Sequence, residues 1–589
     1  MIRIAFLPLA ALALSPALAA PAEGPVRTFQ GADLFSLEVA SDPQISPDGS
    51  QIAYVRRSND VMTDRARATI WLVDVRSGAQ TPLVAGPGAY MSPRWSPDGK
   101  RLAYVSAEDG GAPQLYVRWM ASGATARITG LPDSPSAIAW APDGNRIAYI
   151  TAVPDDAAKF GTPPAKPEGA KWAPPLEVIT ALTYRADGAG YLKPGFDHIF
   201  VVSADGGAPR QLTFGALNDS GPLSWSPDGA TLYFSTNRHK DWERKPLNSE
   251  VYALDVAGGA LTALTSRDGP DAAPVVSPDG RSIAYLGFDD KYLGYQNVGL
   301  YVMNRDGSGS RLLTGNLDRS IDDLAWAGDG KAIFVVYDDH AETKVARVGL
   351  DGSIRPVAGG LSGSALDRPY TGGSFSVARD GTVAFTSGDA LNPADVSVSK
   401  GGEARRLTRL NRDLLGGKAL GQVKPLAVTA ADGRRIDAWM VTPPDFDPAR
   451  KYPLILEIHG GPFAAYAPAF STDYQLYAAA GYIVLYTNPR GSTSYGAEFA
   501  NLIHHAYPGD DYGDLMSAVD AAIAAGNVDT DNLFVTGGSG GGVLTAWIVG
   551  KTDRFKAAVT QKPVIDWASF SLTSDGAPMY HQYWFDKFP

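Results

Sequence analysis

A short glycine-rich stretch contains the residue best placed to do chemistry. Residues 535–542 read Val-Thr-Gly-Gly-Ser-Gly-Gly-Gly, a Gly-x-Ser-x-Gly pattern centred on Ser539. The apolar residues before it predict the end of a buried strand, and residues 543–549 carry apolar side chains at helical spacing. A serine on so sharp a strand-to-helix turn stands out of the sheet as a nucleophile, flanked by glycines because side chains there would collide with the neighbouring strand and helix. The alternative is a glycine-rich turn with a bystander serine.

A second glycine-containing motif, at 459–462, is the candidate source of a backbone N–H donor for the oxyanion. The apolar residues 454–458 predict a buried strand that ends in His-Gly-Gly-Pro at 459–462. The backbone N–H groups of Gly461 and Gly540 are then expected to point at one carbonyl oxygen and form an oxyanion hole. Losing one such donor costs about 3–4 kcal/mol of transition-state stabilisation. The alternative is a plain turn, and His459 is interpreted as a structural residue of this loop rather than as a general base.

The elements around these residues alternate between strands and helices. Strands are expected at 436–441, 454–458, 482–486 and 557–560, and helices at 470–480 and 514–525. This alternation predicts a parallel sheet with right-handed crossovers, and the serine turn within it favours an α/β-hydrolase domain.

The N-terminal half is a repeat built on a Pro-Asp-Gly turn. Seven copies, two of them degenerate, end in glycines at 49, 99, 144, 229, 280, 330 and 381. Proline presets the turn, aspartate caps it and glycine takes the positive φ. Each unit of about fifty residues holds four short strands, which is one propeller blade. We expect a seven-bladed β-propeller, or six blades if the last copy does not close the ring.

Two stretches interrupt the repeat. The proline-rich insertion at 154–195 is expected to be a long loop, either solvated or facing substrate. Asp241, Trp242, Glu243 and Glu250 lie between two strands of the fourth unit. They either bind a substrate amino terminus or form a charged exposed loop, and the exposed loop is the favoured interpretation.

The N-terminus and the composition indicate an exported protein. Residues 1–20 have a positive start, an apolar centre and a small-residue cleavage site, which predicts a signal peptide rather than a retained anchor. The chain has no cysteine, and an exported protein without disulfides is compatible with the periplasm. No later segment reads as transmembrane, so we expect no membrane partner after signal removal. A net charge of −11 without a basic run argues against nucleic acid.

We divide the 589 residues into a signal peptide (1–20), an N-terminal segment (21–42), a β-propeller (43–410) and an α/β-hydrolase domain (411–589). No cofactor and no metal are expected. His504 and His505, followed by Asp510 and Asp511, do not form a zinc signature and are interpreted as a surface loop.

Taken together, these motifs resemble the prolyl oligopeptidase family of serine peptidases, and within it the acylaminoacyl-peptidase and dipeptidyl-peptidase branch. The resemblance covers nearly the whole mature chain and rests on the propeller repeat, the serine elbow and the motifs at 459–462, 488–492, 495–496 and 514–515. It implies a propeller that caps the hydrolase domain and cleavage of short peptides near the amino end. It also implies Ser539 as nucleophile and Gly461 and Gly540 as oxyanion donors. Arg490 lies in the family's Asn-Pro-Arg-Gly motif and either holds substrate carbonyls or anchors its own loop.

The chain departs from the family pattern at two points. Gly540 stands where the family usually has an aromatic residue, so we expect one wall of the site to be lost and the elbow to be less rigid. The acid and the base of the triad should follow the serine after later strands. His581, the only histidine after the elbow, has no strand to place it and is interpreted as a packed residue. We therefore expect a C-terminally incomplete hydrolase domain with an exposed apolar sheet edge, and the triad Asp and His beyond Pro589.

Three functions fit this sequence. The leading hypothesis is a periplasmic serine peptidase that releases acylated residues or dipeptides from short peptides through an acyl-enzyme on Ser539. The second is a non-catalytic propeller protein with a relic hydrolase domain, which is preferred if the native gene stops at Pro589. The third is an esterase of the same fold. A homo-oligomer is left open by the sequence.

Overall fold

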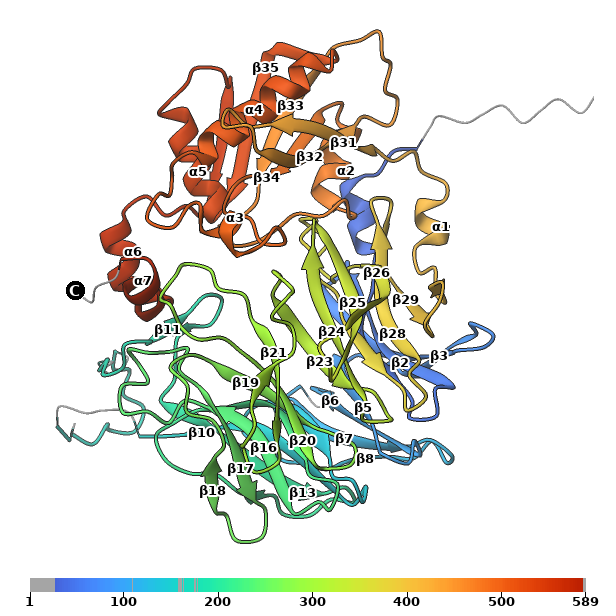
Figure 1. The fold of residues 1–589 in the computed structure, drawn as a ribbon, viewed down its shortest axis with the longest axis vertical. Helices are drawn as coiled ribbons and strands as arrows, with labels where there is room; N and C mark the ends of the chain where they lie inside the picture. Colours follow the sequence, from blue (N-terminus) through green and yellow to red (C-terminus); the bar gives the residue numbers. More distant parts are fainter. Residues whose placement is uncertain are drawn as a thin grey trace, which may run out of the picture.

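The computed structural model describes residues 27–585, apart from 109, 157–160, 163, 174–175 and 177. The predicted signal peptide, residues 1–20, lies outside the described residues. A propeller forms one half of the molecule and a domain with helices around a mixed sheet forms the other (Figure 1). None of the helices within the described ranges is long and apolar enough to cross a membrane.

Seven four-stranded blades make up the propeller within the described residues. The first blade holds β1(Glu38–Ile45), β2(Gln51–Asp60), β3(Arg65–Asp74) and β4(Gln80–Val84). The second holds β5(Tyr90–Trp95), β6(Arg101–Ser106), β7(Gln114–Trp119) and β8(Thr125–Arg127). The third holds β9(Ser136–Trp140), β10(Arg146–Pro154), β13(Gly195–Ser203) and β14(Arg210–Gln211). The next two are β15(Asp219–Trp225), β16(Thr231–Thr236), β17(Glu250–Asp255) and β18(Leu261–Ala263); and β19(Asp271–Val276), β20(Ser282–Gly287), β21(Gly299–Asn304) and β22(Arg311–Leu312).

The sixth and seventh blades are joined into one sheet of eight strands by a pairing between Leu361 and Ser387. The sixth blade holds β23(Ile321–Trp326), β24(Ala332–Asp339), β25(Glu342–Gly349) and β26(Ile354–Leu361), and the seventh holds β27(Phe375–Val377), β28(Val383–Asp389), β29(Asn392–Ser399) and β30(Arg405–Arg406). The prediction of seven blades is confirmed, and the degenerate last copy does close the ring: β1 packs against β27, β28 and β29, and the Ile45 N–H donates to Ser376 Oγ at 2.8 Å.

The repeat motif explains both the turns and the joints between blades. In the first turn, Asp48 Oδ1 accepts from Ser46 Oγ at 2.6 Å and from the Ser50 N–H at 3.0 Å, and Gly49 has a φ of 75°. The tryptophan before the turn binds the preceding blade through its indole N–H, which donates to a carbonyl of that blade's first strand. These pairs are Trp95 with Gln44 (2.9 Å), Trp140 with Arg94 (3.0 Å), Trp225 with Ala139 (3.1 Å) and Trp326 with Val275 (2.8 Å).

The first blade begins earlier than the predicted boundary at residue 43. Strand β1 starts at Glu38, and a bulge between Ser41 and Gln44 separates its two paired halves. The repeat motif marks only the turn after this strand, so the half before the bulge carried no signal. The short helix η1(Gly31–Phe35) precedes it, and this N-terminal segment also contacts the other domain, where Phe29 packs edge-on against Phe470.

The insertion of the third blade reaches the second domain. Its hairpin, β11(Arg185–Ala186) with β12(Gly190–Tyr191), lies beside the C-terminal helices in Figure 1. The Tyr184 hydroxyl donates to the Thr573 carbonyl at 3.3 Å, and the Asp187 N–H donates to Asp575 Oδ2 at 3.0 Å. The part of the insertion that the structure describes therefore forms a contact between the two domains and is not only a solvent-exposed loop.

The second domain is a six-stranded sheet flanked by helices. Its strand order is β31(Gln422–Thr429), β32(Arg435–Thr442), β34(Ile483–Asn488), β33(Tyr452–Ile458), β35(Val528–Gly538) and β36(Ala557–Gln561). Strands β34, β33, β35 and β36 are parallel, as predicted, whereas β31 and β32 are antiparallel. The helices are α1(Arg412–Leu415), α2(Thr472–Ala479), α3(Ala497–Asn501), α4(Asp511–Ala524), α5(Gly540–Val549), α6(Trp567–Thr573) and α7(Ala577–Tyr583).

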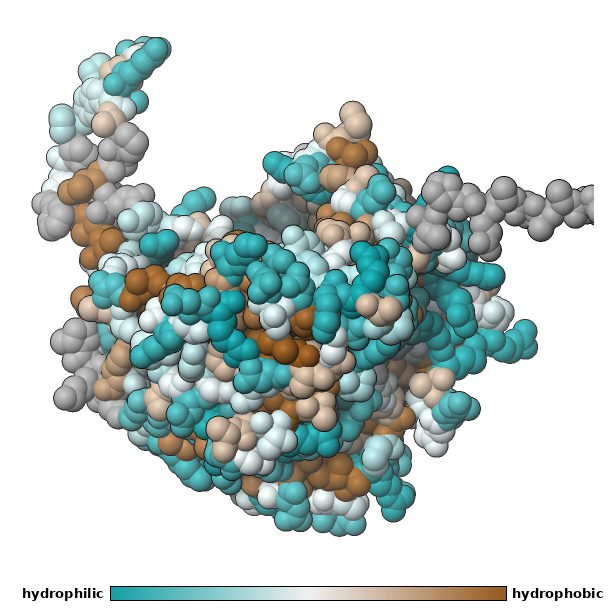
Figure 2. All heavy atoms as spheres, turned by 90° about the horizontal axis from the view of Figure 1, so that it is seen from above, coloured by the Kyte–Doolittle hydropathy of each residue, from teal (hydrophilic) through white to brown (hydrophobic). Residues whose placement is uncertain are grey.

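The core of this domain lies between the sheet and helices α4 and α5. Leu515 and Val519 of α4 are fully buried in one hydrophobic cluster with Leu454 and Leu456 of β33 and Leu544 of α5. Strand β36 is at the edge of the sheet, and Val559 on it is 61% exposed, as the expected apolar edge requires. Figure 2 looks onto this end of the molecule, where hydrophobic side chains are interspersed with hydrophilic ones.

Candidate active site

Ser539 lies at the tip of a strained turn between β35 and α5. Its backbone φ of 57° and ψ of −116° are far from ordinary helix or strand values, and the residue is exposed. The strain is held by two hydrogen bonds, because the Ser539 N–H donates to the Gln561 carbonyl at 3.0 Å and the Val543 N–H donates to the Ser539 carbonyl at 3.0 Å. The predicted turn that lifts residue 539 out of the sheet is confirmed.

The glycines around this serine are required by close packing. A Cβ on Gly541 would lie 2.8 Å from the Ile458 carbonyl carbon and nearer still to its oxygen. A Cβ on Gly542 would clash with the Gln561 carbonyl oxygen and lie 3.2 Å from Pro563 Cα. Helix α5 therefore approaches β33 and the segment after β36 more closely than any side chain permits.

The loop after β33 lies directly against the serine turn. A Cβ on Gly540 would be 3.2 Å from the Gly461 nitrogen, and one on Gly460 would be 3.3 Å from Ser539 Cβ. Gly540 is the first residue of α5, so its N–H has no acceptor within the helix. Among the described residues, neither the Gly540 N–H nor the Gly461 N–H donates a hydrogen bond to a backbone carbonyl in a turn, loop or cap. The two predicted oxyanion donors are thus brought together beside Ser539 with both N–H groups available.

The residue after the serine is supported by Tyr507. The Tyr507 hydroxyl donates to the Gly540 carbonyl at 2.6 Å and would lie 3.0 Å from a Cβ on Gly540. Burial raises the pKa of Tyr507 well above its usual value, so the donor proton is retained. The expected loss of a wall at Gly540 is therefore corrected: a tyrosine from a distant loop occupies that space and holds the first carbonyl of α5.

An aromatic cluster continues from Tyr507 toward the end of the described chain. Tyr507 and Trp567 each pack against Trp584, with ring centroids 5.9 and 6.1 Å apart, and Phe463 packs edge-on against Trp584 at 5.8 Å. His581 is buried nearby in α7, as its interpretation as a packed residue requires. The sequence gave no signal that Phe463 and Tyr507 join this cluster.

His459 holds the loop rather than facing solvent. Its Nδ1 lies 2.8 Å from the Gly460 carbonyl and its Nε2 lies 2.9 Å from Ser492 Oγ. Because a carbonyl only accepts, Nδ1 carries the proton. Complete burial lowers the pKa of His459 to about 4, although the hydrogen bond to the Gly460 carbonyl raises it in part. The ring is therefore neutral at pH 7. This geometry supports the structural role expected of His459.

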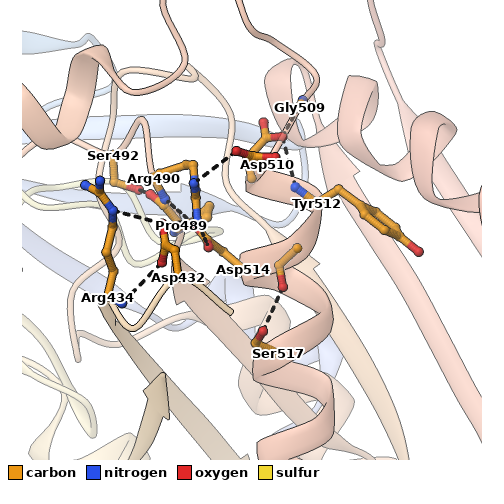
Figure 3. A network of polar contacts seen from close by, with 12 residues as sticks. Asp432, Arg434, Pro489, Arg490, Ser492, Gly509, Asp510, Tyr512, Asp514 and Ser517 are labelled. Atoms are coloured by element: carbon orange, nitrogen blue, oxygen red, sulfur yellow. Dashed lines mark hydrogen bonds and ion pairs between the residues drawn. The ribbon is translucent and has the colours of Figure 1, made fainter. Parts of the chain in front are cut away.

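Arg490 is held by carboxylates on three sides (Figure 3). Its Nε and Nη2 donate to the two carboxylate oxygens of the buried Asp514 at 2.9 and 2.7 Å, and it also pairs with Asp432 at 3.2 Å and Asp510 at 3.4 Å. Such a two-pronged buried pair fixes the loop after β34, which carries Ser492 toward His459. Of the two roles left open for Arg490, the contacts favour anchoring its own loop.

The charged stretch of the fourth blade is not simply an exposed loop. Glu250 is 2% exposed, accepts from Thr265 Oγ1 at 2.6 Å and lies 3.2 Å from His239 Nε2, and burial raises its pKa. Glu243 accepts from the Leu182 N–H of the insertion at 3.0 Å. The favoured exposed-loop interpretation is therefore wrong for Glu250.

The paired histidines, His504 and His505, also have a structural contact, because His504 Nδ1 accepts a hydrogen bond from the Gly294 N–H at 3.1 Å.

Comparison with known proteins agrees with this architecture. A sequence profile described as the prolyl oligopeptidase family matches residues 468–589, and one described as the TolB beta propeller domain matches 34–153 and 189–368. The chain is 32% identical over 563 residues to an uncharacterized peptidase, YuxL, of Bacillus subtilis, covering 92% of this chain and 83% of that protein. It is 27% identical to dipeptidyl-peptidase 5 of Porphyromonas gingivalis, covering 89% and 77%.

Solved structures show the same fold. The acylaminoacyl peptidase of Pyrococcus horikoshii superposes with a TM-score of 0.76 at 18% identity, covering 95% of this chain and 82% of that chain. A puromycin-hydrolyzing peptidase of Mycobacterium tuberculosis superposes with a TM-score of 0.67 at 19% identity, covering 95% and 84%.

Proposed function

Because the chain belongs to the prolyl oligopeptidase family of serine peptidases, we propose that it hydrolyses short peptides through an acyl-enzyme formed on Ser539. One observation carries this proposal: the exposed Ser539 lies at a strained turn, directly against the loop that contains Gly461. Among the described residues, neither the Gly461 N–H nor the Gly540 N–H donates to a backbone carbonyl in a turn, loop or cap. A strained serine beside two such donors is the arrangement that acyl transfer requires.

In the proposed mechanism, Ser539 Oγ attacks the scissile carbonyl carbon, and the negative charge that develops on the carbonyl oxygen is stabilised by the N–H groups of Gly461 and Gly540. The C–N bond then breaks, the amine leaves with a proton, and water releases the acyl group from Ser539. In this fold the acid and the base follow the nucleophile along the chain. Ser539 Oγ makes no hydrogen bond to another described residue, so none of these is assigned as the base.

Cleavage near the amino terminus of short peptides is supported by the cover over the site and by the relatives. Five propeller segments among the described residues touch the hydrolase domain: the insertion hairpin, the segment between β26 and β27, the loops after β20 and β22, and the turn between β24 and β25. In the loop after β20, Asp290 Oδ2 accepts a hydrogen bond from the Tyr583 hydroxyl at 2.6 Å. Such a cover excludes folded proteins and admits chain ends. The relatives named above as a dipeptidyl-peptidase and an acylaminoacyl peptidase both release amino-terminal units by name, so either a free or an acylated terminus fits this proposal.

The test is covalent labelling combined with substrate comparison. The protein as the cell makes it is expected to react with a fluorophosphonate at Ser539, and the Ser539→Ala variant is expected to lose both labelling and peptidase activity. Ser569→Ala, which removes an exposed serine of α6, serves as the matched control and should label normally.

Substrate pairs then separate the candidate reactions. An acetylated and a free dipeptide anilide distinguish the two termini, and a matched ester distinguishes an esterase from a peptidase. Absence of labelling in the unmodified protein would contradict catalysis and favour a binding protein.

We also propose that the protein is exported to the periplasm, on the strength of the signal-like pattern in residues 1–20 and the absence of cysteine from the sequence. Fractionation of cells that carry the unaltered gene tests this, and recovery from the cytoplasm alone would contradict it.

A further inference from the structure

A segment of the propeller is built into the wall of the proposed active site. Residues 362–374, which we call the strap, leave the ring after β26 and return at β27. The strap is fixed to the hydrolase domain by backbone hydrogen bonds: Thr472 N–H to the Leu366 carbonyl (2.7 Å), Ala467 N–H to Pro369 (2.7 Å) and Thr371 N–H to Ala465 (3.0 Å). Tyr370 and Tyr466 form an antiparallel bridge between the two segments.

The strap carries a tyrosine hydroxyl to the glycine loop. Tyr370 Oη accepts a hydrogen bond from the Gly460 N–H at 2.8 Å. A Cβ on Gly460 would be 3.3 Å from Tyr370 Oη and 3.3 Å from Ser539 Cβ, so the hydroxyl and the nucleophile lie against the same glycine. Burial raises the pKa of Tyr370, which keeps the hydroxyl neutral at physiological pH.

An ion pair next to Tyr370 fixes the strap to the strand that leads into the loop. Arg368 Nε donates to Glu457 Oε1 at 2.7 Å, and its Nη1 pairs with Asp473. Glu457 is fully buried in β33, two residues before His459, and burial raises its pKa to about 7 despite the pairing with Arg368. The same short segment thus binds both the end of the strand and the first glycine after it.

Two adjacent glycines need such restraint. Glycine visits a wide range of backbone angles, and Gly461 has a φ of 131°, which favours no other residue. The planar peptide between Gly460 and Gly461 has the Gly460 carbonyl at one end and the Gly461 N–H at the other. His459 fixes the carbonyl end, and Tyr370 fixes the N–H of the preceding peptide plane. With both planes held, the direction of the Gly461 N–H is determined.

We propose that Tyr370 is a positioning residue for the oxyanion hole, supplied by the propeller: its hydroxyl holds Gly460 so that the Gly461 N–H points at the space beside Ser539. This inference rests on the proposed function, because an oxyanion forms there only if Ser539 attacks a carbonyl. It makes the propeller a part of the catalytic geometry in addition to a cover.

The expected effect is on turnover rather than on substrate binding. Complete loss of an oxyanion donor lowers kcat by about 10²–10³-fold. Removing the hydroxyl of Tyr370 leaves the Gly461 N–H present but free to turn away, so we expect a decrease in kcat of about 10–100-fold, with KM within about twofold of the unmodified value.

The experiment compares Tyr370→Phe with Tyr486→Phe in the full protein. Tyr486 is fully buried in β34 of the hydrolase domain, and its hydroxyl has no hydrogen-bond partner among the described residues, so the control removes one buried oxygen without touching the glycine loop. The readouts are kcat and KM on a peptide anilide, the affinity for a peptide boronate that mimics the tetrahedral intermediate, and the urea midpoint. Tyr370→Phe should lower kcat and boronate affinity by the same factor, whereas Tyr486→Phe should leave both unchanged.

Three outcomes decide the matter. If Tyr370→Phe keeps the kcat and boronate affinity of the control, the inference is overturned. It is also overturned if kcat, KM and the urea midpoint all fall together, because the hydroxyl then serves only domain docking. If Ser539→Ala retains activity, the proposed function itself fails, and this result is distinguishable because it does not depend on Tyr370.

Discussion

Replacing Gly541 with alanine is expected to disable the serine turn through a backbone collision. The new Cβ would lie 2.8 Å from the Ile458 carbonyl carbon, 2.9 Å from the His459 oxygen and nearer still to the Ile458 oxygen. Favourable separations between carbon atoms are about 3.5–4.0 Å, and backbone atoms have no side-chain rotamer that would relieve the contact. Overpacking of this kind costs about 1–3 kcal/mol, and more where the backbone must move.

Relief of this collision has a catalytic cost as well. Moving α5 away from the end of β33 removes it, and this movement shifts Ser539 and Gly540 away from Gly461. A misplacement of about 1 Å between reacting groups lowers the rate by about 10²-fold. The Gly541→Ala protein should therefore lose at least about 1 kcal/mol in its free energy of unfolding and about 10²-fold in its rate of labelling by a fluorophosphonate.

The matched control is at the other end of the same helix. Gly550 has a φ of −83°, and the nearest atom to a Cβ there is the Trp547 oxygen at 3.5 Å, an ordinary contact. Gly550→Ala should leave labelling unchanged and stabilise the protein by about 0.4–1 kcal/mol, since alanine restricts the unfolded chain. Urea unfolding followed by circular dichroism and the labelling rate are measured for both variants. If Gly541→Ala matched the unmodified protein in both measurements, the close contact between α5 and β33 would be refuted.

Two further predictions concern the residues that hold the site. The pKa of His459 is about 4 when folded and about 6.5 when unfolded, so the unfolded chain binds more protons between these values and the stability present above pH 6.5 is lost as pH falls toward 4. From pH 8 to pH 5 this loss in the free energy of unfolding is about 2 kcal/mol. Urea unfolding at both pH values should show the loss in the unmodified protein and its absence in His459→Gln. An equal pH dependence in the two proteins would contradict the buried, neutral ring. Arg490→Lys, which cannot reproduce the two-pronged pair with Asp514, should lower the free energy of unfolding by about 1.5–3 kcal/mol. Asp510→Asn is the control, since the Asp510 side chain is 88% exposed and should matter by less than about 0.5 kcal/mol; similar values for both variants would show that the buried pair has no special weight.

Features encoded in contiguous residues were predictable from the sequence. The Pro-Asp-Gly turns repeat because each blade needs the same hydrogen-bonded turn, so seven copies gave seven blades. The turn at Ser539 was predictable because strand, glycines and helix follow one another directly. The glycine loop at 459–462 was predictable for the same reason, since it ends an apolar strand.

Features that depend on distant contacts carried no such signal. Tyr507 reaches Gly540 from 33 residues away, and Tyr370 reaches Gly460 from 90 residues away, without a motif around either tyrosine. The partners of Arg490 come from a β-turn and a helix that the sequence did not link to its loop. The start of the first blade was misplaced because the bulge at Ser41 hides the first half of β1 from the repeat.

The pairing of Leu361 with Ser387 joins the sixth and seventh blades into one sheet, whereas the other blades are separate sheets. The strap leaves and re-enters the propeller next to this pairing, so a force that pulls on the strap acts on both the sixth and the seventh blade. The opposite side of the seventh blade meets the first blade through the packing of β1 on β27, β28 and β29 and through hydrogen bonds such as that from the Ile45 N–H to Ser376 Oγ. Load applied through the strap is therefore carried into the ring by strand pairing on one side of the seventh blade and by packing against β1 on the other.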